Sequence, residues 1–322
     1  MADFIHRFLF GDTSLKNDGE KVSAAMVMDL GKEGWVGIPH GGIGMGAILE
    51  LAEAADRAAS CRPEAPCPMS FAFRMGGSGA RVGDSVMMEA MAADGKINGA
   101  ITVVGADMPY ISAEIGFGEV SCQTDEYARG YVPAAYGEIA GKLAHLPHYL
   151  NCFVCGVDRK LPGLKRRFHL WQSQHGPVVC AFAGFNDEDR ETFFRFERDG
   201  AVHPMAVMAL LDETMGWGGF FASGNGGVSV RLNYRILRKI SVKEKLVFFG
   251  RGEKVSGWID KRMLFWASGA ACVLGPDGAF EKVVESSGQW YAMAALTEQM
   301  RQELIPKELT EAAFAVAENI GV

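Results

Sequence analysis

The most apolar part of the chain is the run over residues 205–222, in which Asp212 and Glu213 are the only charged residues. A helix of that composition has no polar face to turn to water, so other elements must wrap it. A second helix-like run covers residues 43–59. Each run is followed by short apolar or alternating segments at the spacing of β-hairpins. Strands grouped around one long helix predict an α+β fold with a mostly antiparallel sheet.

This order of elements occurs twice. The turn GIPHGG precedes the first helix and AVHP precedes the second, so His40 and His203 open the two helices 163 residues apart. A repeat of that length is a whole domain. The strand-like segments are FIHRFLFG, KVSAAMVMDL, PMSFAF, SVMMEAMAA, GAITVVGA and YISAEIGFG in the first half, and LKRRFHLWQ, VVCAFAGF, GVSVRLNYRIL, KLVFFGRGEKV, KRMLFWASGAACVL and FEKVVESSGQWY in the second. The expected divisions are an N-terminal domain over 1–120, a connector over 121–150 with a short helix from Ala134 to Leu143, a C-terminal domain over 151–293, and a tail over 294–322 with an amphipathic helix over 294–320.

Composition narrows the range of functions. Hydrophobic residues make up 48% of the 322 positions and charged residues 22%, which is typical of a folded globular protein. The net charge of −7 and the isoelectric point near 5.6 argue against a nucleic-acid-binding face. No uncharged apolar stretch is long enough to predict a membrane span. The N-terminus lacks a secretory pattern, so we expect a cytoplasmic protein whose seven cysteines are reduced.

Several motifs together resemble a known family. HGG at 40–42 opens an apolar helix, Asp-Glu follows His203 by nine residues, and GVSVRLNYRIL comes next. They resemble the hotdog-fold acyl-CoA thioesterases of the PaaI type, and NCFVCGVDRKLPGL is similar to the start of many such proteins. The resemblance implies a double hotdog, two fused domains that each wrap an antiparallel sheet around one long helix. It implies an acyl-CoA or acyl-carrier thioester as substrate, no cofactor beyond that coenzyme A, and compatibility with a homodimer of double hotdogs.

The resemblance also assigns site residues. Asp212 falls on the helical carboxylate that serves as general base or nucleophile, and Gly41 on the backbone N–H that polarises the thioester carbonyl. Ser229 falls on the serine contributed by the partner domain, with Ser70 in the matching stretch of the first half. The chemistry needs these parts because water is a poor nucleophile and the developing oxyanion needs a fixed donor. We expect Asp212 to face the stretch near Ser70 and Ser229 to face the first helix.

Both halves depart from the family pattern. In the first half, the position of the acid is Leu49, and the next residue, Glu50, is either a substitute acid or part of a solvated face. In the second half, Pro204 replaces the glycine and has no N–H to offer, which leaves the N–H of Met205 as a substitute donor. Neither half therefore carries the whole apparatus. His40 and His203 either fix the turn before each helix or take a direct part in the chemistry.

Binding residues are less specific. Gly42 and Met205 are candidates for substrate binding because they stand at the helix entrances. Arg235, Arg238 and Lys239 either hold the phosphates of a CoA nucleotide or are solvated surface charges.

Two other motifs indicate different chemistry. Residues 42–47 fit a variant dinucleotide fingerprint, but no strand–helix alternation follows it. Cys152 and Cys155, with His145 and His148 upstream, are four side chains of zinc-binding types at a spacing that is short for a zinc finger, and we expect no metal. The alternatives to a thioesterase are a non-catalytic acyl-CoA or lipid-binding module and, third, an enoyl-thioester hydratase or dehydratase.

Overall fold

The computed structural model describes residues 4–60, 66–76, 79–118 and 131–320. Its helices are α1 (Phe4–Phe10), α2 (Gly41–Ser60), α3 (Pro204–Ser223), α4 (Ala294–Glu303) and α5 (Lys307–Ile320). The strands of the main sheet are β1 (Lys16–Asn17), β2 (Val22–Val27), β5 (Met69–Met75), β6 (Ser85–Ala93), β7 (Lys96–Val103), β8 (Ile111–Phe117), β9 (Leu143–His145), β11 (Phe168–Ser173), β12 (Gly176–Ala183), β15 (Gly227–Ile236), β16 (Leu246–Ser256), β17 (Leu264–Leu274) and β18 (Phe280–Ala292). Three short antiparallel pairs are β3 (Glu33–Trp35) with β4 (Ile38–Pro39), β10 (His148–Tyr149) with β19 (Leu304–Ile305), and β13 (Glu197–Arg198) with β14 (Ala201–Val202).

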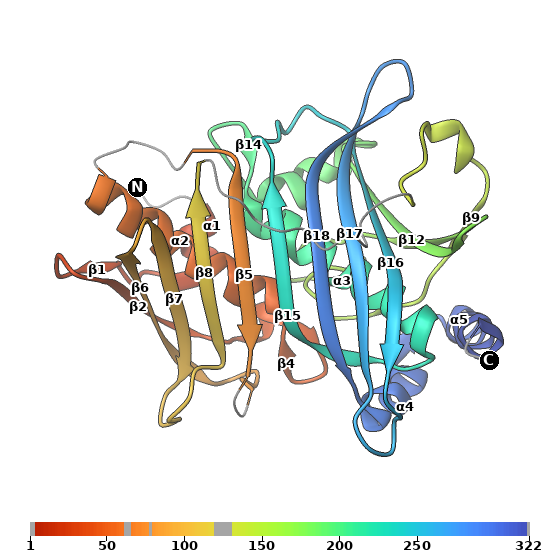
Figure 1. Cartoon of the computed structure of the whole chain (residues 1–322), viewed down its shortest axis with the longest axis horizontal. Helices are drawn as coiled ribbons and strands as arrows, with labels where there is room; N and C mark the ends of the chain where they lie inside the picture. Colours follow the sequence, from red (N-terminus) through yellow and green to blue (C-terminus); the bar gives the residue numbers. More distant parts are fainter. Residues whose placement is uncertain (1–3, 61–65, 77–78, 119–130, 321–322) are drawn as a thin grey trace.

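One sheet of 13 strands runs through both halves of the molecule, in the order β1-β2-β6-β7-β8-β5-β15-β18-β17-β16-β12-β11-β9. Read outward from the centre, the first half (β5, β8, β7, β6, β2, β1) mirrors the second (β15, β18, β17, β16, β12, β11). The halves join where β5 pairs antiparallel with β15, with Phe71 opposite Tyr234. The start of β15 therefore lies beside the end of β5. Figure 1 shows that the strands of the first half curve over α2 and those of the second half curve over α3.

The helix α3 is buried along almost its whole length, as its composition predicts. It begins at His203, whose side chain caps the first turn, and Pro204 follows at the first helical position, where a missing N–H does no harm. It ends at Gly224, which adopts a φ of 69° in the left-handed region. These signals place the helix boundaries within two residues of the predicted run.

The two central helices cross at small residues. A methyl group on Gly42 would overlap Ala209, and one on Gly46 would overlap Met205. Because residue numbers rise along α2 while they fall along α3, the helices are antiparallel. The first turn of each helix therefore meets the middle of the other, which creates two interhelix sites related by approximate twofold symmetry.

Three predicted elements differ in the structure. Residues 4–10 form a helix rather than a strand, because Ile5 and Leu9 are buried on one helical face and so short an apolar run does not separate the two periods. The helix expected from Ala134 to Leu143 shortens to a single 3₁₀ turn, Tyr136–Glu138. The terminal helix is broken at Leu304–Ile305, just before Pro306.

The domain boundaries stay a prediction, since residues 119–130, where the connector begins, lie outside the described residues. The five cysteines within the described part of the chain are free, and Cys61 and Cys122 lie outside it. No helix of the described residues combines the length and apolar character that crossing a bilayer requires.

Candidate active site

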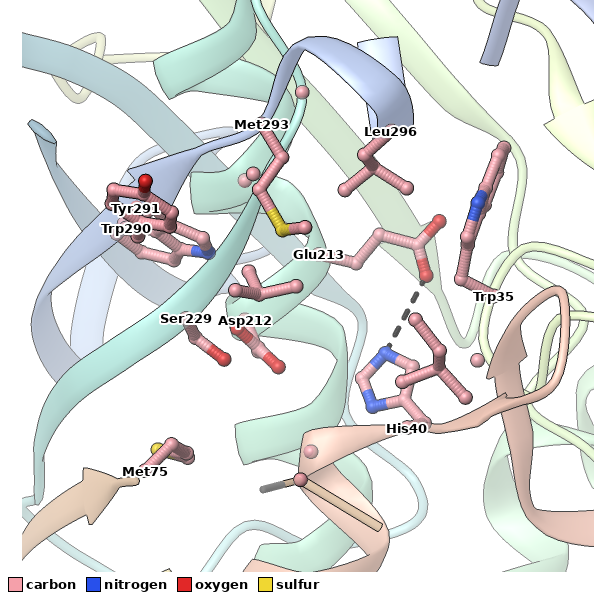
Figure 2. A pocket seen from close by; sticks show the side chains of 18 of the residues that line it. Trp35, His40, Met75, Asp212, Glu213, Ser229, Trp290, Tyr291, Met293 and Leu296 are labelled. Atoms are coloured by element: carbon pink, nitrogen blue, oxygen red, sulfur yellow. Dashed lines mark ion pairs between the residues drawn. The ribbon is translucent and has the colours of Figure 1, made fainter. Parts of the chain in front are cut away.

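A cavity of about 570 Å³ opens where the first turn of α2 meets the middle of α3 and the start of β15. Figure 2 shows His40, Asp212, Glu213 and Ser229 around it. His40 and the adjoining Gly41 come from the first half of the chain, and the other three come from the second half. The site is therefore built across the junction and not within either half.

Asp212 lies directly against the entrance of α2. A methyl group on the α carbon of Gly41 would stand 3.1 Å from Asp212 Oδ2 and 3.7 Å from Ser229 Oγ. Ser229 thus faces the first-half helix, as expected. Within the described residues, no donor bonds the Asp212 carboxylate and no acceptor bonds the N–H of Gly41, one of the orphan donors of a first helical turn. An unpaired acid and an unpaired N–H donor are therefore neighbours in one cavity.

The surroundings of Asp212 change its acidity. Burial raises the pKa of Asp212 to about 6, nearby Glu213 adds to the rise, and His40 opposes it. Tyr110 also lines the cavity, and burial together with Asp212 raises its pKa to about 12. A carboxyl group that titrates near neutral pH can take a proton in one step and return it in the next.

His40 holds the turn that presents Gly41. Its Nδ1 accepts a hydrogen bond from the N–H of Gly42 at 3.0 Å, so its proton is on Nε2, which lies 3.7 Å from Glu213 Oε2. Glu213 in turn lies 3.2 Å from Cys152 Sγ. Nδ1 is thus engaged in the turn before α2, which favours the turn-fixing interpretation over a direct chemical role.

His40, Cys152 and Glu213 form the one group of at least three His, Cys, Asp or Glu side chains with metal-ligand spacing that the described residues contain, with ligand atoms within 4.8 Å of one another. Cys152 Sγ accepts two backbone N–H groups, from Val154 and Cys155, each at 3.3 Å. The four-ligand set suggested by sequence is not assembled, because His145, His148 and Cys155 are not in this group, and the ring of His145 contacts that of His169 with centroids 4.8 Å apart.

The second interhelix site has the same plan and different contents. His203 Nδ1 accepts from the N–H of Met205 at 3.2 Å, and His203 Nε2 lies 2.8 Å from Glu50 Oε1. Arg198 lies 2.9 Å from the other oxygen of Glu50. Burial alone would raise the pKa of Glu50, but the bonds from His203 and Arg198 outweigh it and lower the pKa to about 2. Glu50 is thus a permanently ionised member of a buried cluster.

Both departures from the family pattern fall in this second site. Pro204 is at the entrance of α3, and the fully buried Leu49 is on the facing turn of α2. The proposed substitute donor, the N–H of Met205, is occupied by His203 Nδ1. Met205 itself packs against Gly46. The first site keeps its N–H and its acid, whereas the second site has Pro204 and Leu49 at the corresponding positions and a carboxylate, Glu50, that is paired.

Several other candidates lie away from the cavity with Asp212. Gly42 packs against Ala209 and gives its N–H to His40. The expectation that Asp212 faces Ser70 is wrong, because the antiparallel junction brings Met75, at the other end of β5, to this cavity.

The predicted phosphate-binding cluster is also misplaced relative to Asp212. Arg238 and Lys239 line a second cavity of about 370 Å³ together with His203 and Pro204. Arg238 is paired with Glu244 and Glu281, and Arg235 lies near Glu285. These cations belong to the surroundings of the second site.

No protein-family model matches the sequence, and no curated protein matches it. The structure is similar to that of a protein assigned as an oleoyl thioesterase from Lactobacillus plantarum, with a TM-score of 0.51 and 12% identity over 89% of this chain and 98% of that chain. The chain has the double-hotdog fold. Further matches are a hot dog-fold protein of unknown function from Alicyclobacillus acidocaldarius (TM-score 0.44, 12% identity, 87% of this chain and 96% of that chain) and the dehydratase domain of the polyketide PpsC from Mycobacterium tuberculosis (TM-score 0.46, 13% identity, 90% and 99%).

The double hotdog also brings to the site residues that the motifs did not indicate. Trp35, Trp217 and Trp290 line the cavity, and the tail helix α4 adds Leu296 and Met300. When the two halves are aligned at the 163-residue offset, Gly216 of the cavity corresponds to Glu53. This difference between a glycine and a long charged side chain is the one signal in the sequence that could have indicated the cavity. The contribution of α4 has no counterpart in the first half, and the repeat could not reveal it.

Proposed function

We propose that the protein hydrolyses acyl thioesters, of coenzyme A or of an acyl carrier, at the single site formed by Asp212, Gly41 and Ser229. The observation that supports this is the distribution of parts between the sites. The free N–H of Gly41 and the buried acid Asp212 meet at one cavity, and Pro204 and Leu49 occupy the corresponding helix positions of the other interhelix site. Arg81, the one Lys or Arg along the described lining of the cavity, is exposed at its edge and is available to a carrier phosphate.

In the proposed mechanism the thioester carbonyl points its oxygen at the N–H of Gly41, where the helix dipole also favours negative charge. Ionised Asp212 removes a proton from a water molecule as the water oxygen bonds to the carbonyl carbon. The tetrahedral oxyanion is held by Gly41. When it collapses, the C–S bond breaks and the thiolate takes the proton back from Asp212. Ser229, at the same edge of the cavity, orients the water or the substrate.

Two other functions predict different results for the same residues. A binding module takes acyl-CoA without turnover. An enoyl-thioester hydratase depends on a histidine, and His40 is the one at this cavity. The hydrogen bond that His40 Nδ1 accepts from the N–H of Gly42 does not favour that role.

The test is thiol release from a panel of acyl-CoAs by the wild type, Asp212→Asn and Glu50→Gln. We expect Asp212→Asn to lose at least about a hundredfold in kcat, the lower range for loss of a general base. Glu50→Gln makes the same chemical change in the second site and should keep the rate. Equal losses in both variants would contradict a single site. Binding without turnover in the wild type would favour the binding module.

A further inference from the structure

Beyond Asp212, the cavity continues between α3, β18 and the tail helix α4. Its inner part is bounded by apolar and aromatic side chains. These are Trp35, Trp217, Phe220, Trp290, Met293, Leu296, Met300 and Leu304. The charged groups on the described lining are Asp212, Glu213, which lies 3.2 Å from Cys152 Sγ, and Arg81, which is exposed at the edge. The volume of about 570 Å³ is within the range of cavities that enclose a small molecule.

Gly216 creates room for this chamber. It lies one helical turn after Asp212 on α3, and a methyl group on it would meet only Trp290 Nε1, at 3.8 Å. The neighbouring Gly218 and Gly219 are different, because their missing side chains are replaced by Arg251 and Phe265. The space beside Gly216 is therefore the chamber itself. At the equivalent place in the second site stands Glu53, paired with Arg198 at 3.3 Å.

The tail helix α4 closes the chamber, and it is fastened from two directions. Trp35 Nε1 donates to Gln299 Oε1 at 2.7 Å, which connects α4 to the first half of the chain. The N–H of Gly226 donates to Thr297 Oγ1 at 3.0 Å, which connects it to the start of β15. Met293, Leu296 and Met300 then face the cavity as its wall (Figure 2 shows the first two). This wall is part of the folded site because it shares hydrogen bonds with both halves.

We propose that this chamber binds a bulky, wholly apolar acyl group, and that Gly216 and the α4 wall determine the largest group it admits. The proposal rests on the proposed function for the reaction at Asp212. A charged acyl end would meet one N–H donor beside Gly216, Trp290 Nε1, and no Lys or Arg on this part of the described lining, so its burial there is unfavourable. Each additional buried methylene gains about 0.8 kcal/mol, close to fourfold in affinity, until the wall is reached. Specificity should therefore rise with chain length and then fall sharply.

The test compares kcat/KM for straight-chain acyl-CoAs from acetyl to palmitoyl, with succinyl-CoA as the charged case. Gly216→Leu should move the optimum to shorter chains and lower kcat/KM for the wild-type optimum by at least about tenfold. Leu296→Ala/Met300→Ala should move the optimum to longer chains. Gln302→Ala, on the exposed face of α4, is the matched control and should leave the profile unchanged. Because Gly216→Leu could fail to fold, the α4 variant tests the proposal in the opposite direction.

Binding is measured in parallel with acyl-CoA analogues whose thioester is replaced by a thioether, by calorimetry. If chain length shifts affinity in the variants but no thioester is hydrolysed, the chamber stands and the proposed reaction fails. If thioesters are hydrolysed but neither variant shifts the chain-length profile, the reaction stands and the chamber is overturned. Preference for succinyl-CoA over butyryl-CoA would also overturn it.

Discussion

The two interhelix sites share one plan, yet they hold opposite kinds of carboxylate. Asp212 is buried without a hydrogen-bonding partner in the described residues, and its pKa rises to about 6. Glu50 is buried among His203 and Arg198, and its pKa falls to about 2. One site keeps a reactive acid beside a free N–H, and the other neutralises its acid in an ion-pair cluster. Fusion of the halves into one chain permits this division, since each residue then serves only one site.

The largest expected effect is on kcat, and it comes from placing a proline at the first position of α2, as in α3. Gly41→Pro removes the N–H, as Pro204 does in α3, and proline is tolerated at a first helical position. Loss of one oxyanion donor lowers kcat by about 10²–10³-fold. Gly41→Ala keeps the N–H and is the control, with its methyl group 3.1 Å from Asp212 Oδ2. Equal rates for the proline and alanine variants would remove Gly41 from the mechanism.

The next effect concerns stability rather than rate. Glu50→Ala leaves His203 without its buried carboxylate and removes one of the two carboxylates paired with Arg198, so it should cost about 3 kcal/mol of unfolding free energy, with kcat nearly unchanged. Because the pKa of Glu50 is lowered in the folded state, its contribution is present above pH 4.5 and disappears as the pH falls towards about 2. Urea unfolding at several pH values measures this. Glu89→Ala breaks the exposed pair with Lys21 and should cost less than about 1 kcal/mol.

The pH profile distinguishes the two acids directly. Asp212 acts as a base only when ionised, so kcat/KM should rise about tenfold per pH unit below pH 6 and level off above it. Glu50 is already ionised throughout that range and contributes no limb. A limb near pH 4 instead would mean that Asp212 is not desolvated in the working enzyme. Stability at each pH is followed separately by thermal unfolding.

The smallest effect is expected for the hydroxyl group at the start of β15. Ser229→Ala should lower kcat/KM by about fivefold, the value of one hydrogen bond of about 1 kcal/mol. Ser70→Ala makes the same change near the start of β5 and should have no effect on rate. A larger loss from Ser70→Ala than from Ser229→Ala would mean that the reaction takes place at the end of the β5–β15 pair that holds Ser70 and not at the end that holds Ser229.

The sequence predicted the repeated plan and the two central helices, because both depend on local pattern, and the apolar run around Asp212 indicated a buried carboxylate, whose catalytic role stays a prediction. It did not predict that Leu49 and Pro204 would fall in the same site, since that depends on the antiparallel crossing of α2 and α3. The misplacement of Ser70 has the same origin, because the register of β5 with β15 is a long-range property. Leu296 and Met300 reach the site through tertiary packing of α4, which no local pattern encodes.

The crossing of the central helices also determines which halves can pair. In this chain Gly42 meets Ala209 and Gly46 meets Met205, so a small residue on α2 faces a larger one on α3 at both contacts. Two copies of the first half would place glycine against glycine and leave voids, whereas two copies of the second would force Met205 against Ala209. Complementary residue size at these two contacts therefore favours pairing between the two different halves over pairing between two identical halves.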